Sequence, residues 1–528
     1  MDINQQNKNG ETPMYAAARN GDPQVITLLK SLGAAVDIPD EDGATPVYIA
    51  AYEGNVEAII ALNAAAADMN KPDNCNHAPV YAAALNGHAK SIAALRASGA
   101  NIDALNNKGE TPLYIAAEQG HKEAIVALIS AGANVNTLNH DGETPIFSSA
   151  KNGHSSAITA LHAAGADVNT KNKHGLTPIC FSAENGHAEA VTIFHTLGAD
   201  VNTPCTSGLT PIFFAAENGH ASTIAALRAE DANVNARNND DETPVYVAAK
   251  KGHAAAIAAL HAAGADVNAT KSGITPVYVA AENGHTEAIT SLITAGADVN
   301  ILKPDGTTSV YAASLRGYAE TIVVLHAAGA NVDTGNNNDE TPVYAAAKHG
   351  HATAIAALYT VGANVNTANH DGMTPVFVAA QNNHPSTITA LHAAGANMNT
   401  AIPDSRTPMF MAAQLGNPEA ITALLAAGAD ANIKAQWGTA LEYAKRGKEP
   451  GQLEVVRRLE AHLKQCPNGV KPIEAHKNDV VFRANVTSTA EQKNPPVLIQ
   501  FEQKSAILPQ KYFPKHSIWN SKNRRNRN

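Results

Sequence analysis

A Thr-Pro pair recurs every 33 residues along most of this 528-residue chain, and no other feature constrains the fold as strongly. Two registers depart from the pair, at Ala78-Pro79 and Thr308-Ser309, and one spacing is 32 residues long, from Thr243 to Thr275. A fixed period of this length is typical of a solenoid, in which each repeat packs on its neighbours. The paired threonines are Thr12, Thr45, Thr111, Thr144, Thr177, Thr210, Thr243, Thr275, Thr341, Thr374 and Thr407.

Residues 110–142 illustrate what one unit is expected to contain. Thr111 is a good N-cap, and Pro112 suits the first position of a helix because its missing N–H has no partner there. Gly120 is expected to end this helix in the left-handed conformation, and His121 to open a second helix. The unit therefore predicts two antiparallel helices joined to the next unit by a hairpin-like loop.

The repeated pattern D-x-x-G-x-T-P-L-x-x-A-A-x-x-G-H-x-x-x-I-x-x-L-x-x-x-G-A-x-V-N resembles the ankyrin repeat. Thirteen full units run from about Asp2 to Ala431, and a degenerate closing unit follows. The resemblance implies an all-α repeat fold, an ankyrin solenoid of helix-turn-helix units over residues 2–465. Residues 466–528 leave the period and are predicted to form a short irregular basic tail that is largely disordered. The units are expected to start near residues 10, 43, 76, 109, 142, 175, 208, 241, 273, 306, 339, 372, 405 and 437.

An aromatic residue stands two residues after most of the prolines, where ankyrin repeats usually carry histidine, and Cys180 is the exception. We expect a buried column in which ring packing replaces the usual histidine hydrogen bonds. The column comprises Tyr15, Tyr48, Tyr81, Tyr114, Phe147, Phe213, Tyr246, Tyr278, Tyr311, Tyr344, Phe377 and Phe410.

Several units depart from the pattern in ways that should weaken them. Ala78 lacks the capping hydroxyl, and Ser309 replaces the proline. Ala66 and Asp231 stand where a glycine is expected to end the second helix, so they must adopt a strained left-handed conformation. Because the unit that ends before Thr275 also lacks one loop residue, we expect a local kink or fraying near residues 230–275.

The 22 histidines raise the question of a metal site. Equivalent residues of stacked repeats lie about 10 Å apart, whereas zinc needs its nitrogen ligands at about 2.0–2.1 Å from one point. We therefore interpret the histidines as capping and packing residues and expect no metal and no cofactor. Nine of them follow the end of a first helix: His88, His121, His154, His187, His220, His253, His285, His351 and His384.

Catalytic motifs are absent from the sequence: there is no GxSxG, P-loop, HExxH or Gly-rich dinucleotide turn. The four cysteines include no CxxC pair and are too few for a disulfide framework, which favours a reducing, intracellular environment. The N-terminus lacks the regions of a secretory signal, and no apolar run would span a bilayer. We expect a cytoplasmic, non-enzymatic, monomeric protein.

The resemblance implies a concave binding surface made by the first helices and the loop tips. The last residues of the first helices vary in charge while the frame repeats, so they are the predicted partner-binding residues. Four glutamates among them favour a protein partner with a basic segment. The predicted residues are Glu118, Gln119, Lys151, Asn152, Glu184, Asn185, Glu217, Asn218, Lys250, Lys251, Glu282, Asn283, Arg316 and Lys348.

Charge divides the chain into two parts. Residues 1–465 carry a net charge of −17 and residues 466–528 one of +7, which together give the −10 of the whole chain. Nucleic acid is not expected to bind the acidic array. Two alternatives to a scaffold are an effector enzyme with its activity in the tail, and an adaptor that uses the basic C-terminus for nucleic acid, an anionic membrane or a nuclear address. The regular, alanine-rich repeats also resemble ankyrin proteins that intracellular bacteria deliver into host cells.

Overall fold

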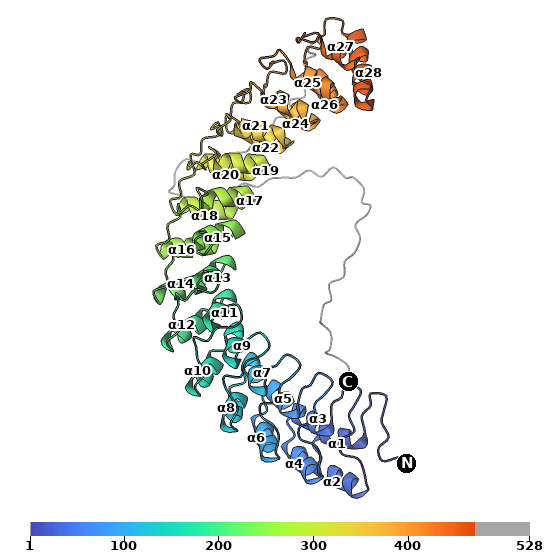
Figure 1. Ribbon diagram of the computed structural model, residues 1–528, viewed down its shortest axis with the longest axis vertical. Coiled ribbons are helices and arrows are strands. Elements are labelled where there is room, and N and C mark those ends of the chain that lie inside the picture. Colours follow the sequence, from blue (N-terminus) through green and yellow to red (C-terminus); the bar gives the residue numbers. More distant parts are fainter. Residues whose placement is uncertain (1, 470–528) are drawn as a thin grey trace, which may run out of the picture. The chain divides into compact units, whose positions relative to one another are not determined.

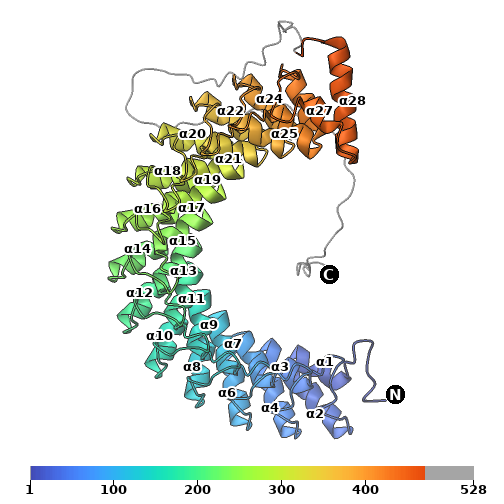
Figure 2. The ribbon, with the colours of Figure 1, turned by 45° about the horizontal axis from the view of Figure 1, so that its top comes forward.

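The computed structural model describes residues 2–469, which form 28 helices and no strand (Figure 1). The helices follow one another as pairs, and each helix packs against its counterparts in the preceding and following repeats. First helices form one layer and second helices another (Figure 2). The predicted all-α ankyrin solenoid is confirmed. Predictions for residues 470–528, including the disordered tail and its basic cluster, lie outside the described residues.

The helices are numbered in chain order, so odd numbers denote first helices. The first helices are α1 (Pro13–Asn20), α3 (Pro46–Glu53), α5 (Pro79–Leu85), α7 (Pro112–Gln119), α9 (Pro145–Asn152), α11 (Pro178–Glu184), α13 (Pro211–Glu217), α15 (Pro244–Lys251), α17 (Pro276–Asn283), α19 (Ser309–Arg316), α21 (Pro342–Lys348), α23 (Pro375–Gln381), α25 (Pro408–Leu415) and α27 (Ala440–Ala444). The second helices are α2 (Pro23–Ser31), α4 (Val56–Ala64), α6 (Ala89–Ala97), α8 (Lys122–Ser130), α10 (Ser155–Ala163), α12 (Ala188–Thr196), α14 (Ala221–Ala229), α16 (Ala254–Ala262), α18 (Thr286–Thr294), α20 (Ala319–Ala327), α22 (Ala352–Thr360), α24 (Pro385–Ala393), α26 (Pro418–Ala426) and α28 (Pro450–Gln465).

One hydrophobic cluster runs through all the repeats, from Met14 to Leu459. In a typical repeat, the alanine pair of the first helix, such as Ala116 and Ala117, is fully buried. The small side chains allow helices to approach closely, and apolar residues of the second helix, such as Ile125, fill the remaining space. Because no repeat closes this core alone, each repeat depends on its neighbours for burial.

The predicted aromatic column is buried apart from the half-buried Tyr48, but the expectation that ring packing replaces hydrogen bonds is wrong for several tyrosines. Their hydroxyls donate to carboxylates of the next hairpin loop: Tyr311 to Glu340 Oε2 at 3.1 Å, and Tyr114 to Glu143 Oε2 at 3.3 Å. The tyrosine ring thus fills the core while its hydroxyl holds the neighbouring loop. Cys180 is also buried, and burial raises the pKa of its thiol, as expected for an inert core cysteine.

The threonines begin the first helices, but three of them do not cap as predicted. Most accept a hydrogen bond from the amide three residues on, as Thr111 Oγ1 does from Tyr114 N at 3.1 Å. In α9, α11 and α13 that amide donates to the threonine's backbone carbonyl instead. The Thr144 hydroxyl is consequently buried without a hydrogen-bond partner. Ala78 uses the same backbone bond, so its repeat starts a helix without a capping side chain.

These two kinds of helix start should respond differently to loss of the hydroxyl. Thr111→Val should lower the local stability of α7 by about 1 kcal/mol, because it removes an N-cap bond. Thr144→Val should cost less than half as much in α9, because its hydroxyl has no partner to lose. Hydrogen exchange of the α7 and α9 amides measures both, and equal losses would contradict the assignment.

The histidines that follow the first helices do not cap their own helices, which corrects the prediction. Each Nε2 lies 2.8–3.2 Å from a backbone carbonyl near the end of the preceding repeat's first helix. A carbonyl only accepts, so Nε2 carries the donated proton. Asn55 and Asn417 make the same contact through their amide nitrogens, whereas Tyr318 occupies the position without such a bond. All nine of these histidines therefore link two adjacent repeats through a hydrogen bond from Nε2.

The glycine that ends most first helices makes room for the side chain of the next repeat, which is usually this histidine. Gly120 has a φ of 73°, and a Cβ added there would lie 2.6 Å from Nδ1 of His154. Such a contact is far inside the van der Waals distance. Glycine is therefore required twice at this position, for its left-handed backbone and for the approach of the next repeat's ring.

Gly120→Ala should consequently destabilise the array more than Gly132→Ala. Both residues have positive φ, which costs roughly 1–2 kcal/mol for alanine, but a Cβ on Gly132 meets nothing within 4 Å. Urea unfolding followed by circular dichroism compares the two variants. Adding His154→Ala to Gly120→Ala should recover part of the loss, and a purely additive double variant would show that the ring is not the obstacle.

The stack continues through residues 230–275, where a kink or fraying was expected. Helices α14 and α16 contact the second helices on both sides, and the shortened loop closes with a bridge between Lys271 and Ile274. Asp231 and Ala66 adopt the expected left-handed backbone, with φ of 61° and 62°. Loop shortening is thus absorbed locally, and fraying stays a prediction.

Candidate functional site on the first-helix face

The predicted partner-binding residues lie at the ends of the first helices. We call this surface, together with the hairpin loops beside it, the first-helix face. Gln119, Lys151 and Glu184 are exposed, and Glu118 is half-buried, whereas the preceding alanines are fully buried. The structure therefore places these varied side chains at the solvent boundary of an otherwise repeated frame.

Inter-repeat histidine bonds fix the backbone under these side chains. The carbonyl of Glu118 accepts from His154 at 2.9 Å, and that of Glu184 accepts from His220 at 2.9 Å. The residue that presents a variable side chain to solvent is thus the residue whose carbonyl is bound by the next repeat. Its position is set by stacking and does not depend on the identity of its side chain.

Ion pairs along the face occupy several of the predicted charges. Lys251 lies 3.1 Å from Glu217, and Arg316 lies 3.5 Å from Glu282, in each case joining adjacent repeats. These partly exposed pairs contribute little stability, but they reduce the free charge of the surface. Among the described residues, Glu118 and Glu184 form no ion pair. Of the four glutamates expected to attract a basic partner, only these two therefore carry a charge that is not already paired.

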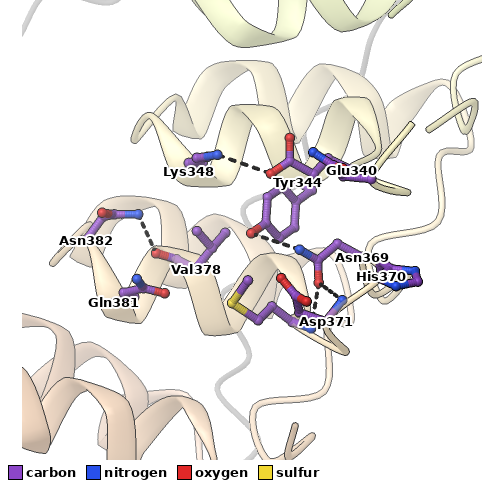
Figure 3. A pocket seen from close by; sticks show the side chains of 11 residues that line it. Glu340, Tyr344, Lys348, Asn369, His370, Asp371, Val378, Gln381 and Asn382 are labelled. Carbon is purple, nitrogen blue, oxygen red and sulfur yellow. Dashed lines mark hydrogen bonds and ion pairs between the residues drawn. The ribbon is translucent and has the colours of Figure 1, made fainter. Parts of the chain in front are cut away.

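Hollows open on this face between a hairpin loop and the first helices. One, of about 340 Å³, lies between α21, α23 and the loop that joins their repeats (Figure 3). Burial, with the charges of Glu340 and Asp371, raises the pKa of Tyr344 in its wall to about 12, so this tyrosine remains a neutral hydroxyl. The lining residues are Asn338, Glu340, Tyr344, Lys348, Asn369, His370, Asp371, Met373, Val378, Gln381 and Asn382. A similar hollow of about 310 Å³ lies beside α13 and α15.

Seven segments of the chain match the family model for ankyrin repeats in three copies: residues 1–73, 60–139, 80–172, 146–238, 223–303, 309–402 and 377–468. The chain belongs to the ankyrin-repeat family. Ankyrin repeats are protein–protein interaction domains, which agrees with an exposed, varied first-helix face. No curated protein matches the sequence. None of the helices within residues 2–469 combines the length and the apolar character needed to cross a membrane.

Sequence reasoning missed the buried Glu242 and the half-buried Glu340 behind the ankyrin array's first-helix face. Glu242 is 8 % exposed, and its Oε1 accepts from Lys271 at 2.8 Å and from Lys250 at 3.3 Å. Glu340 accepts from Lys348 at 3.1 Å. The spacing Glu-Thr-Pro-x5-Lys could have revealed both pairs. Lys250 and Lys348, predicted to be free for a partner, are thus already engaged.

The Glu242 cluster makes the ankyrin array sensitive to acid. Burial raises the pKa of Glu242, but the hydrogen bonds from Lys271 and Asn238 and the charge of Lys250 outweigh it and lower the pKa below 4.5. A carboxyl with a lowered folded-state pKa stabilises the fold above its unfolded pKa and loses that contribution as pH falls through the folded value.

Glu242→Gln should therefore lower the local stability of α15 at pH 7 by roughly 1–2 kcal/mol. The difference from the parent protein should shrink as pH falls below 4.5, because the parent glutamate is then protonated as well. Hydrogen exchange of α15 amides, corrected for intrinsic rates, measures this. Glu189→Gln on the exposed face of α12 serves as the control, and a loss independent of pH would contradict a charge effect.

One hairpin loop brings together metal-ligating groups that the sequence analysis overlooked. Asp73, Cys75 and His77 each place one ligand atom within 4.8 Å of the others. The histidines at repeated positions lie too far apart to share an ion, but His77 is not one of them and has its co-ligands within its own loop. The D-x-C-x-H spacing was the available signal.

Proposed function

We propose that the protein is a non-enzymatic scaffold that binds partner proteins along its first-helix face. One observation carries the proposal. The residues at the ends of the first helices vary from repeat to repeat and face solvent, while their backbone carbonyls are bound by the histidine of the next repeat. A surface held in this way loses little conformational freedom on binding, so more of the contact energy is available for affinity.

The partner we infer carries basic side chains that contact Glu118 and Glu184. These two carboxylates form no ion pair among the described residues, and they stand on α7 and α11, two repeats apart. At 8–10 Å per repeat they are roughly 20 Å from each other. An extended segment covers this distance in about six residues, so two basic residues about six positions apart would match.

Other predictions concern parts or properties outside the described structure. An enzymatic tail and an adaptor role for the basic C-terminus both concern residues that lie mainly beyond 469. Delivery into a host cell, a cytoplasmic or nuclear location and the monomeric state also stay predictions.

The partner proposal is tested by reversing the two unpaired charges. Glu118→Lys with Glu184→Lys should weaken binding of a captured partner at least about tenfold, because attraction becomes repulsion at both contacts. The matched control is Glu123→Lys with Glu189→Lys, which makes the same charge change on the second helices α8 and α12. Pull-down identifies partners, and calorimetric titration gives their affinities.

Three results are informative. Weakening by the first variant alone supports the proposed face and the basic segment. Equal weakening by both variants would mean that net charge alone matters. Retention of every partner at unchanged affinity by the first variant would exclude the Glu118–Glu184 region.

A further inference from the structure

The hairpin loop that joins the second and third repeats, residues 73–77, holds three side chains of different ligand chemistry on one turn. Nδ1 of His77 lies 3.0 Å from Oδ2 of Asp73, and Cys75 is an exposed free thiol. Among the described residues, this is the only group of three His, Cys, Asp or Glu side chains close enough to share a metal ion.

Backbone bonds hold these residues in place. Oδ1 of Asp73 accepts from the amides of Cys75 at 2.9 Å and of His77 at 2.7 Å, which leaves Oδ2 toward the imidazole. Asn76 turns the loop with a φ of 62°. The His77 ring stacks on Tyr81, with centroids 4.3 Å apart and planes inclined by 17°. Ligand orientation is therefore largely set before any ion binds.

We propose that Asp73, Cys75 and His77 form a Zn²⁺-binding site. Thiolate, imidazole and carboxylate are the ligands that zinc prefers in proteins. Oxygen and nitrogen ligands at about 2.0–2.1 Å from a tetrahedral ion are about 3.3 Å apart, close to the 3.0 Å between Asp73 and His77. The sulfur lies within 4.8 Å of both, so a rotation of the exposed Cys75 side chain brings it to bonding distance.

Binding changes protons but not oxidation states. The Cys75 thiol releases its proton and binds as thiolate. In the bond to Asp73, Nδ1 of His77 is the donor because a carboxylate oxygen only accepts. On metal binding this proton leaves Nδ1, passing through solvent to Nε2 of the neutral ring, and the freed Nδ1 lone pair and the Asp73 carboxylate form two metal–ligand bonds in place of the hydrogen bond. Affinity should therefore rise with pH, because protons compete with the ion.

Three protein ligands leave one position of the ion open for water or for a ligand from another molecule. The hollow in Figure 3 is lined by the equivalent loop of a later repeat. In the repeat register, Asp73, Cys75 and His77 correspond to its lining residues Asn369, Asp371 and Met373. A bound ion would lie at the equivalent place on the first-helix face. The site does not depend on the proposed partner, and its test uses the metal alone.

Titration of the full-length protein with Co²⁺, after treatment with a chelator, tests the site. Binding should approach one ion per chain and give thiolate-to-cobalt charge-transfer absorption, and Zn²⁺ should displace the cobalt. Cys75→Ser should abolish the charge-transfer band, and His77→Ala should weaken binding at least about 100-fold. Cys205→Ser is the control, because Cys205 stands in an equivalent loop at the position of Asp73, where Ser207 and Leu209 replace Cys75 and His77.

The outcomes are distinct. Loss of the band in Cys75→Ser with an unchanged helical spectrum, and retention in Cys205→Ser, supports the site. Absence of stoichiometric binding to the parent protein, or an unchanged band in Cys75→Ser, overturns it. If His77→Ala disturbs the loop through the lost stacking on Tyr81, Cys75→Ser still decides, since its side chain is exposed.

Discussion

The contact between the histidine of one repeat and a carbonyl of the preceding repeat underlies the rest of this structure. It satisfies a backbone acceptor at the end of a first helix, where no intrahelical donor is available. It also places an aromatic ring against a glycine, so that glycine at position 120 is required by its neighbour as well as by its own backbone. Together with the alanine-rich core, this contact makes cohesion a property of adjacent pairs of repeats.

The same contact uses the backbone of a residue for stability and leaves its side chain available for recognition. The histidine binds the main-chain carbonyl of a residue in the preceding repeat, and the side chain of that residue is free to vary. Glutamate, lysine, leucine and tyrosine all occupy the position above an equivalent bond. A surface can thus change its charge from repeat to repeat without altering the frame. The ion pairs between Glu217 and Lys251 and between Glu282 and Arg316 show that part of this variation is matched between neighbours.

The solenoid, its two helices per unit and the buried aromatic positions followed from the 33-residue period, because periodicity reports which positions face the core. The capping geometry did not, since Thr111 and Thr144 have the same local sequence pattern and differ in which oxygen accepts the amide. Ion pairs across the face join residues more than thirty positions apart and needed the stacking geometry. The Asp73 loop was predictable from its D-x-C-x-H spacing, but the metal hypothesis was weighed on the histidines at repeated positions, and His77 is not one of them.

Donation through Nε2 makes the inter-repeat bond independent of the charge of the histidine ring. A ring that donates from Nε2 keeps this bond whether or not Nδ1 also carries a proton, just as the uncharged amides of Asn55 and Asn417 keep theirs. Either charge of the ring therefore leaves the inter-repeat donor in place, and stacking through this bond does not depend on which charge the ring carries.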